Sequence, residues 1–354
     1  MHMDGVNGIT QCPIAPNDYF VYKFNATQYG SSWYHSHYSV QYADGATGPM
    51  TIHGPTSAEW DEAISPPLIM TDWGHNSAFA AVSSGANGLE HPDILLNGLG
   101  NVTNFNNKTL NTTIIEDPYS ITFEGPQAGY STKKYLLRII NTSYDSTFVF
   151  SIDNHNLTII STDFVPITPY TSNSVLVGIG QRYNVIVEAN PLVYDDNSPL
   201  PEDGNYWIRT LVAPCFGQAG DPGYERTGVL RYDSSSTETP STKPWPNIPT
   251  DCSDEEASNL HPILQWTVQS PVNNLTADDF SLWRSGSPPG PPFPLAKWTL
   301  GLDDEFAAIR INYSDPTFFH LDNTAGWDPL WRIVPENYTS EDWVCQSCFL
   351  FIHS

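Results

Sequence analysis

The chain has 354 residues, long enough for two or three domains, and its 39 acidic and 14 basic residues give a formal net charge of −25. This negative charge argues against nucleic acid and anionic membranes as partners. No apolar run approaches the roughly 20 residues that a membrane-spanning helix needs. The first residues, MHMDGVNGIT, lack the basic start and apolar stretch of a signal peptide.

Short aromatic-rich runs, separated by many of the 30 prolines and 24 glycines, predict an all-β chain. The first strands are expected in residues 18–55, among them SSWYHSHYS at 31–39. After a polar break, a second set runs from LIMTDWGH at 68–75 to GVLRYD at 228–233, with turn sequences such as Asn97-Gly98 between strands. This regular spacing indicates a β-sandwich or barrel.

The composition changes at residue 233. Residues 233–260 are rich in serine, threonine, proline and acidic side chains without an apolar period, which predicts a linker. A third region starts at HPILQWTV and holds a few strand-like pieces around a proline-rich loop at 285–294. These pieces are too few to close a sandwich of about seven strands.

Sequons and cysteines both indicate an exported protein. Nine Asn-x-Ser/Thr sequons in an acidic, lysine-poor chain favour a secreted glycoprotein whose signal peptide is missing. The five cysteines leave at least one unpaired in an oxidising compartment, which also indicates an incomplete chain. The sequon asparagines are Asn25, Asn101, Asn107, Asn111, Asn141, Asn156, Asn274, Asn312 and Asn337.

Two histidines flank one serine in the run at 31–39. Alternate side chains of a strand project from one face, so His35 and His37 are expected to point the same way, with Cα atoms roughly 6.5–7 Å apart. This separation suits one imidazole on each of two neighbouring metal ions better than two on one ion. Imidazole binds copper, zinc, iron and nickel. On spacing alone, a chance pair in a β protein is the simpler interpretation.

The surrounding sequence changes that interpretation. GSSWYHSHYSVQYADGATGPMTIHGP closely resembles the second copper-ligand motif of laccases, the blue multicopper oxidases, and MDGVNGITQCPIAPNDYFVYKF resembles the preceding segment in its ascomycete form. YLLRIINTS, IDNHNLTIISTDFVPI and VGIGQRYNVIVEA resemble the second laccase domain, and NYSDPTFFHLDN resembles an early strand region of the third. The resemblance covers residues 3 to about 344.

The resemblance implies three cupredoxin-like Greek-key β-sandwiches. The chain would hold the C-terminal part of the first (1–58), the complete second (59–235), a linker (236–260) and the N-terminal part of the third with a divergent tail (261–354). In the family, a type 1 copper takes single electrons from phenols or aromatic amines, and a trinuclear cluster reduces O2 to water. His35 and His37 would each bind a different type 3 copper of that cluster.

The family draws its trinuclear ligands from four His-x-His motifs, of which this sequence contains one. His-Trp-His-Gly, His-Pro-x-His-Leu-His-Gly and His-Cys-His are absent, and with them the type 1 ligands. We therefore expect a laccase-type copper oxidase by family, with four coppers in a complete member, and weak or no copper binding and no oxidase activity in this chain. The alternative is a non-catalytic, secreted, glycosylated β-sandwich protein. A monomer is expected.

The resemblance assigns roles to further residues. Cys215 and Cys252 match a pair that bridges the second and third domains, so a disulfide is expected. Cys12 matches a cysteine whose partner near the family's C-terminus is absent, so a free thiol is expected. Laccases place a carboxylate near HPDILLNG that accepts a proton from the phenol, and Asp93 is the candidate, with Pro92 at the other possible register. A solvated turn aspartate is the simpler interpretation of Asp93.

The remaining metal-ligand residue types form no complete site. Cys345-x-x-Cys348 with His353 is half a zinc site without a fourth ligand. His155 is expected to be a hydrogen-bonded strand residue. The other histidines without an expected ligand role are His2, His53, His75, His91, His261 and His320.

Overall fold

The chain divides into two compact units, residues 24–265 and residues 1–23 together with 266–354. In the second of these units, the described secondary structure is one antiparallel pair, β15 (Ala296–Trp298) and β16 (Phe306–Ala308). The computed structural model describes residues 5, 11–74, 76–83, 93–100, 118–126, 131–194, 199–213, 226–249 and 252–264, besides these two strands.

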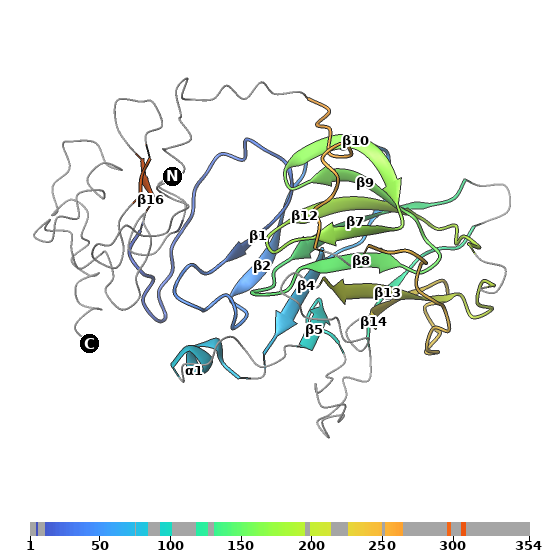
Figure 1. Cartoon of the computed structure of the whole chain (residues 1–354), viewed down its shortest axis with the longest axis horizontal. Coiled ribbons are helices and arrows are strands. Elements are labelled where there is room, and N and C mark those ends of the chain that lie inside the picture. The colour runs from blue at the N-terminus through green and yellow to red at the C-terminus, as the bar shows by residue number, and fades with distance from the viewer. Residues whose placement is uncertain are drawn as a thin grey trace, which may run out of the picture. The chain divides into compact units, whose positions relative to one another are not determined.

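A two-stranded antiparallel hairpin opens the larger unit. It consists of β1 (Gly30–His35) and β2 (Thr47–Ile52), with Gly30 opposite Ile52 and His35 opposite Thr47. In Figure 1 the hairpin lies beside β7 (Lys134–Asn141) and β12 (Arg182–Glu188) of the sandwich that follows, and β1 contacts both strands. The hairpin is therefore held from one side by the sandwich.

The sandwich consists of two sheets. The first has the strand order β10-β9-β12-β7-β4-β5, with β3 also paired to β7, and the second has the order β11-β8-β13-β14-β6. The first sheet is built from β3 (Glu62–Ala63), β4 (Leu68–Trp73), β5 (Asp93–Leu96), β7 (Lys134–Asn141), β9 (Leu157–Thr162), β10 (Val165–Ser172) and β12 (Arg182–Glu188). The second sheet is built from β6 (Tyr119–Thr122), β8 (Phe148–Ile152), β11 (Ser174–Val177), β13 (Asn205–Val212) and β14 (Arg226–Arg231).

Alternation along the strands explains the core. In β7, Leu137 and Ile139 belong to the main buried cluster between the sheets, so Leu136 and Arg138 project from the outer face. Leu136 belongs to a second buried cluster, which the partly buried Trp60 helps to cover. The first sheet is thus buried on both faces along β7, which agrees with the nearly continuous apolar run YLLRII.

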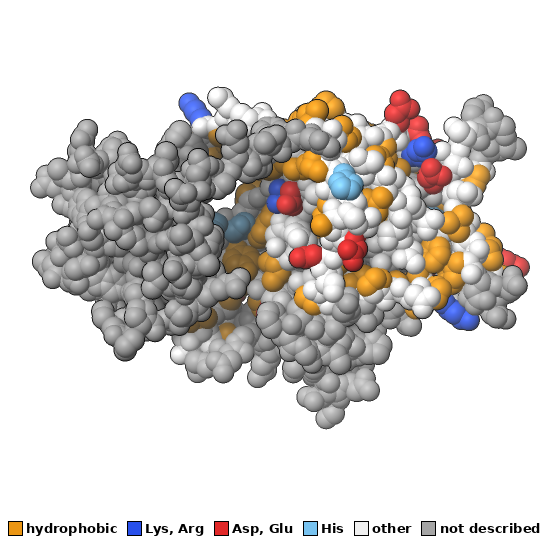
Figure 2. Space-filling view, turned by 45° about the horizontal axis from the view of Figure 1, so that its top comes forward, with side chains coloured by type: hydrophobic (Ala, Val, Ile, Leu, Met, Phe, Trp, Pro, Cys, Tyr) orange, Lys and Arg blue, Asp and Glu red, His pale blue; other side chains and the backbone are white. Residues whose placement is uncertain are grey.

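The predicted all-β fold class is confirmed, because a single short helix, α1 (Ala78–Ser83), interrupts the strands among the described residues. No helix in the described part of the chain has the length and apolar character to cross a bilayer. On the face shown in Figure 2, the described acidic side chains are scattered among uncharged and apolar ones, and some of them lie next to a basic side chain. The net charge is therefore not gathered into one patch on this face.

The segment predicted as a linker attaches to the sandwich. The Thr242 hydroxyl donates to Asp153 Oδ2 at 2.7 Å. The Glu255 carboxylate accepts from the Tyr170 hydroxyl at 2.9 Å and from the Leu176 amide at 3.1 Å. Composition predicts the lack of regular structure here but not these attachments, because they depend on single side chains meeting distant strands.

Candidate metal centre

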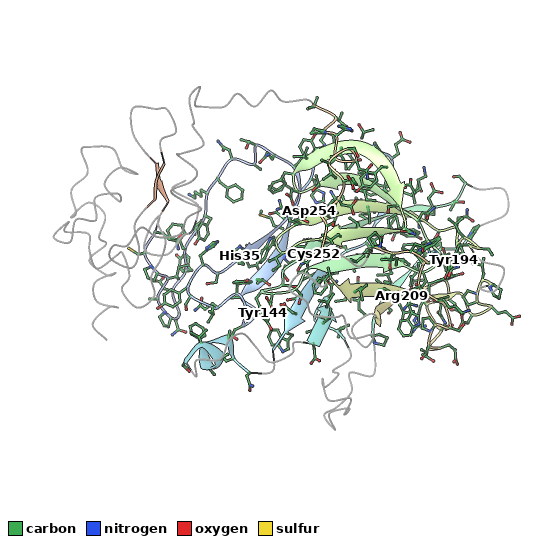
Figure 3. The ribbon with its side chains drawn as sticks, viewed as in Figure 1. His35, Tyr144, Tyr194, Arg209, Cys252 and Asp254 are labelled. Atoms are coloured by element: carbon green, nitrogen blue, oxygen red, sulfur yellow. The ribbon has the colours of Figure 1, made fainter. Side chains whose placement is uncertain are left out.

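The His-x-His pair lies at the end of β1. The His35 and His37 ring centroids are 4.6 Å apart, and Trp33 stacks on His35 with centroids 4.0 Å apart and ring planes 24° apart. Tyr34, between Trp33 and His35, is 63 % exposed. The two imidazoles therefore lie on the same side of the chain, as the strand alternation predicted (His35 is labelled in Figure 3).

The strand itself is shorter than predicted. It ends at His35 rather than Ser39, because the Ser36 hydroxyl accepts from the Tyr38 amide at 3.0 Å and donates to Gln41 Oε1 at 2.7 Å. Such local side-chain bonds offer the backbone a turn in place of a sheet ladder. His37 is consequently an exposed residue beyond the strand, while His35 is partly buried.

The electrostatics favour neutral imidazole at His35. Burial lowers the pKa of His35, the nearby Ser36 carbonyl at 3.4 Å raises it in part, and His37 lowers it further. Neutral imidazole is the form that binds metal ions. Within the described residues, no group of three or more His, Cys, Asp or Glu side chains is placed to hold a metal. The pair therefore fits two copper ligands without completing a site.

A cavity of about 590 Å³ adjoins the hairpin. Tyr42 and Gly45 line it from the loop between β1 and β2, and Asp72, Asp93 and Tyr144 line it from the sandwich. Apolar residues such as Pro49, Ile69 and Leu95 form much of the remaining lining. A mostly apolar lining with a few polar groups is typical of small-molecule sites.

Asp93 begins β5 and is only 2 % exposed. The interpretation of Asp93 as a solvated turn aspartate is therefore wrong. The cause is the pairing of β5 with β4, which places Asp93 opposite Trp73 and closes the strand end against the cavity.

Sequence reasoning missed the second buried carboxylate of this cavity, Asp72. Its oxygens accept from the amides of Tyr144 at 2.9 Å, Asp145 at 3.0 Å and Ser146 at 2.9 Å. Burial raises the pKa of Asp72, and these hydrogen bonds oppose the rise. The alternation of buried positions in LIMTDW was a signal for an inward-facing Asp72, because it shares the buried face with Leu68 and Met70.

Two tyrosines complete the polar lining. Burial raises the pKa of Tyr42, and the Asp72 carboxylate raises it further. Burial likewise raises the pKa of Tyr144. The Tyr144 hydroxyl is buried and has no hydrogen-bond partner among the described residues. This end of the unit, which holds His35 and Tyr144 in Figure 3, lies away from the labelled Arg209.

The cysteines differ from prediction at one position. Cys12 is disulfide-bonded, so the predicted free thiol is wrong, because Cys12 pairs with another cysteine. Cys252 is also disulfide-bonded. Its predicted partner, Cys215, lies outside the described residues, as do Cys345 and Cys348, so the Cys215–Cys252 pairing stays a prediction.

The sequons fall into two environments. Asn25 and Asn156 are exposed. Asn141 is fully buried, and its Nδ2 donates to the carbonyls of Ser146 and Val177, each at 2.9 Å. Both amide hydrogens of Asn141 are used, so this folded structure contradicts a glycan there. The sequons outside the described residues are Asn101, Asn107, Asn111, Asn274, Asn312 and Asn337.

His155 is a structural residue, as expected. It is 1 % exposed, its Nδ1 lies 2.8 Å from the Asp153 carbonyl, and its Nε2 lies 2.8 Å from the Tyr232 hydroxyl. It occupies the turn between β8 and β9 rather than a strand. Of the other histidines, His53 and His261 are exposed, and those outside the described residues are His2, His75, His91, His320 and His353.

Comparison with known proteins gives the fold its context. The chain is 40 % identical over 97 % of its length to a laccase of Arthroderma benhamiae and 38 % identical over 97 % of its length to dihydrogeodin oxidase of Aspergillus terreus. It covers 52 % and 55 % of these two proteins, so it spans about half the length of such relatives. The crystal structure of the laccase from Botrytis aclada is 39 % identical and superposes with a TM-score of 0.63 over 76 % of this chain and 47 % of that chain.

The sandwich, the flanking hairpin and this superposition define a cupredoxin-like β-sandwich protein. Two family profiles described as Multicopper oxidase match residues 65–235 and 1–57. The chain belongs to the multicopper oxidase family and is of the fungal laccase type. Membership implies copper as the cofactor of the family. The domain boundaries expected from the sequence stay predictions.

Proposed function

We propose that this chain supplies the second His-x-His pair of a laccase-type copper oxidase, with His35 and His37 each binding a different type 3 copper. The observation that carries the proposal is the pair of imidazoles on one side of the chain, with ring centroids 4.6 Å apart. Copper in such a site would supply the one-electron chemistry that couples substrate oxidation to the reduction of O2.

The chain's own residues prepare this pair in two ways. Trp33 stacks on His35 and restricts its ring orientation. Burial lowers the pKa of His35, which keeps the imidazole free of a proton at neutral pH. The sequence holds a single His-x-His pair, so we propose that the chain by itself binds copper weakly and does not turn over O2. Four coppers belong to the complete family member.

We propose phenols or aromatic amines as substrates of the complete oxidase, and the cavity beside the hairpin as the part of this chain that meets them. Asp93 is our candidate for accepting the phenolic proton, and its burial in the lining of a cavity of about 590 Å³ supports this role. Relatives of similar identity carry different names, laccase and dihydrogeodin oxidase. We therefore propose the substrate class and not one substrate.

Export, glycosylation and a monomeric state are also proposals.

Copper titration of the purified chain tests the metal role. We expect weak Cu(II) binding that His35→Asn and His37→Asn each abolish, and that the control His261→Asn, at an exposed histidine, retains. We expect neither a blue absorption band nor oxygen uptake with a phenol. Copper binding that survives both ligand substitutions contradicts the assignment, and four coppers with a blue band contradict the inactivity of the chain.

Phenol binding tests the role of Asp93. Quenching of tryptophan fluorescence should report a phenol in the cavity, because Trp73 lines it. Asp93→Asn is expected to weaken this binding, whereas Glu59→Gln, at an exposed acidic residue outside the cavity lining, should leave it unchanged. Equal phenol binding by the two variants would show that Asp93 does not contribute to the substrate site.

A further inference from the structure

A second, smaller cavity lies where the chain leaving β2 crosses the outer face of the first sheet. Its volume is about 50 Å³. His53 and Trp60 line it from the crossing segment, and Arg138, Ser161 and Asn184 line it from the sheet. None of the described residues around it is Asp or Glu.

The three sheet residues form one row across three strands. Arg138 of β7 lies opposite Asn184 of β12, and Asn184 lies opposite Ser161 of β9. The register between β12 and β9 shifts after Asn184, where Val185 pairs with Ile159 and leaves Ile160 as the extra residue. A bulge of this kind re-aims side chains, and both Ile160 and Ser161 line the cavity.

Arg138 has a charge without a partner. No hydrogen bond or ion pair to its guanidinium is found in the described part of the chain, where Arg182 and Arg209 are both paired with aspartates. Burial lowers the pKa of Arg138, and no neighbouring carboxylate offsets this effect. Arg138 is partly buried, and a charge that loses part of its contact with water is stabilised by an opposite charge beside it.

Ser161 provides a second and independent observation. Its side chain is 6 % exposed, and its buried hydroxyl has no hydrogen-bond partner in the part of the chain that the structure describes. Such groups are rare in folded proteins, where buried hydroxyls are normally bonded to protein or water. Asn184 is also 6 % exposed, and its Oδ1 accepts the Ser31 hydroxyl at 2.6 Å, which leaves Nδ2 as a donor.

We propose that this cavity binds one small inorganic anion of the size of chloride, held by the Arg138 guanidinium, the Ser161 hydroxyl and the Asn184 amide. All three groups donate hydrogen bonds, and an anion accepts them while balancing the Arg138 charge. A single water needs roughly 10–15 Å³ of such space, so about 50 Å³ admits a small anion but not an organic carboxylate of substrate size.

The anion would have a structural effect. Its donors lie on the sheet, and His53 and Trp60 belong to the segment that joins the hairpin to the sandwich. Asn184 also bonds Ser31 of β1. A bound anion would therefore fix the hairpin against the sandwich. This effect is independent of copper, because none of the donors is a candidate copper ligand.

Bromide replaces chloride as a probe in the test. A crystal of the full chain soaked in sodium bromide should show an anomalous peak inside the cavity. In solution, chloride should raise the unfolding midpoint above that in gluconate, an anion too large for the cavity, at equal ionic strength. Arg138→Met is expected to weaken chloride binding at least ~10-fold, as loss of a charge-assisted hydrogen bond implies. Ser161→Ala should weaken it several-fold.

Lys134→Met is the matched control, because it removes one positive charge from the same strand at a half-exposed residue paired with Glu188. It should keep the chloride response. A chloride response that is equal in Arg138→Met and Lys134→Met, or a cavity without a bromide peak, would show that the space holds only water and would overturn the proposal. If Arg138→Met does not fold, an unchanged response in Ser161→Ala has the same consequence.

Discussion

The sandwich and the hairpin in front of it are stabilised by different kinds of contact. The sandwich encloses a continuous buried cluster, to which Leu137, Phe150 and Val185 contribute, whereas the hairpin leaves Tyr34 and Tyr38 exposed. The hairpin depends on a few fixed points, chiefly Ser31 bonded to Asn184 and Arg182. The sandwich therefore provides most of the stability, whereas the candidate copper ligands lie on the hairpin.

The largest effect is expected from the buried ion pair of the sandwich. Arg209 donates to both oxygens of Asp153, at 2.6 and 2.7 Å, and both side chains are almost fully buried. Arg209→Met should lower the free energy of unfolding by about 3–5 kcal/mol, because the Asp153 charge stays buried without its partner. Urea unfolding measures the loss.

The control for this substitution is Lys133→Met, which removes the surface pairs with Glu62 and Glu124. It should leave the urea midpoint unchanged within error, because exposed ion pairs add little to stability. A similar shift in both variants would contradict the distinction between buried and surface charges in the sandwich.

His155 should make the sandwich sensitive to acid. Burial lowers its pKa from 6.5 to about 4. Between these pH values the unfolded chain binds a proton that the folded chain does not. The free energy of unfolding therefore has its full value above pH 6.5 and falls as the pH drops towards 4. The loss is about 3 kcal/mol at most. Urea unfolding of the chain and of His155→Gln across this pH range measures it, and equal slopes in the two proteins would contradict the assignment.

A smaller and local effect is expected at the base of the hairpin. Gly30 has a φ of +139°, and a Cβ there would lie 2.8 Å from the Asp163 carbonyl oxygen. Gly30→Ala should destabilise the hairpin by about 1–3 kcal/mol and increase hydrogen exchange in β1 and β2.

Gly98→Ala is the control, because Gly98 also has a positive φ, +78°, but has open space around it. Alanine at position 98 is strained by the positive φ but does not collide with a neighbouring atom. Exchange in β1 and β2 should stay at the unsubstituted level in Gly98→Ala. Accelerated exchange in both variants would show that the hairpin does not depend on the contact with Asp163.

The smallest effect is expected at Tyr144. Its hydroxyl is buried and meets no hydrogen-bond partner within the described ranges, whereas the Tyr135 hydroxyl accepts from the Glu124 amide at 2.8 Å. Tyr144→Phe should leave the unfolding midpoint unchanged or raise it slightly, and Tyr135→Phe should cost about 1 kcal/mol. Thermal unfolding of the two variants distinguishes them. A clear loss in Tyr144→Phe would mean that its hydroxyl is hydrogen-bonded in solution.

Much of the fold could be predicted because it depends on local patterns. The alternating and continuous apolar runs of YLLRIINTS and RYNVIVE correspond to β7 and β12. Alternation also predicted that His35 and His37 lie on one side, and their rings do lie close together although β1 ends at His35. The end of β1 was not predictable from this pattern, because it depends on the Ser36 hydroxyl meeting Gln41.

The less predictable parts depend on contacts between distant segments. The burial of Asp93 follows from the pairing of β5 with β4, and the burial of Asn141 follows from its bonds to the loop before β8 and to β11. No short stretch of sequence contains that information. The family resemblance supplied the copper chemistry, which the spacing of two histidines alone did not.

The buried amide of Asn141 has a practical consequence for producing this protein. In a eukaryotic host, oligosaccharide is transferred to sequons on the nascent chain before the polypeptide has folded. A sugar added to Asn141 at that stage could not be accommodated at the end of β7, since both amide hydrogens are needed by Ser146 and Val177. Chains modified there would be diverted to degradation. Replacing Ser143 with alanine would remove this sequon and should raise the yield from such hosts, because its buried hydroxyl has no hydrogen-bond partner among the residues that the structure describes.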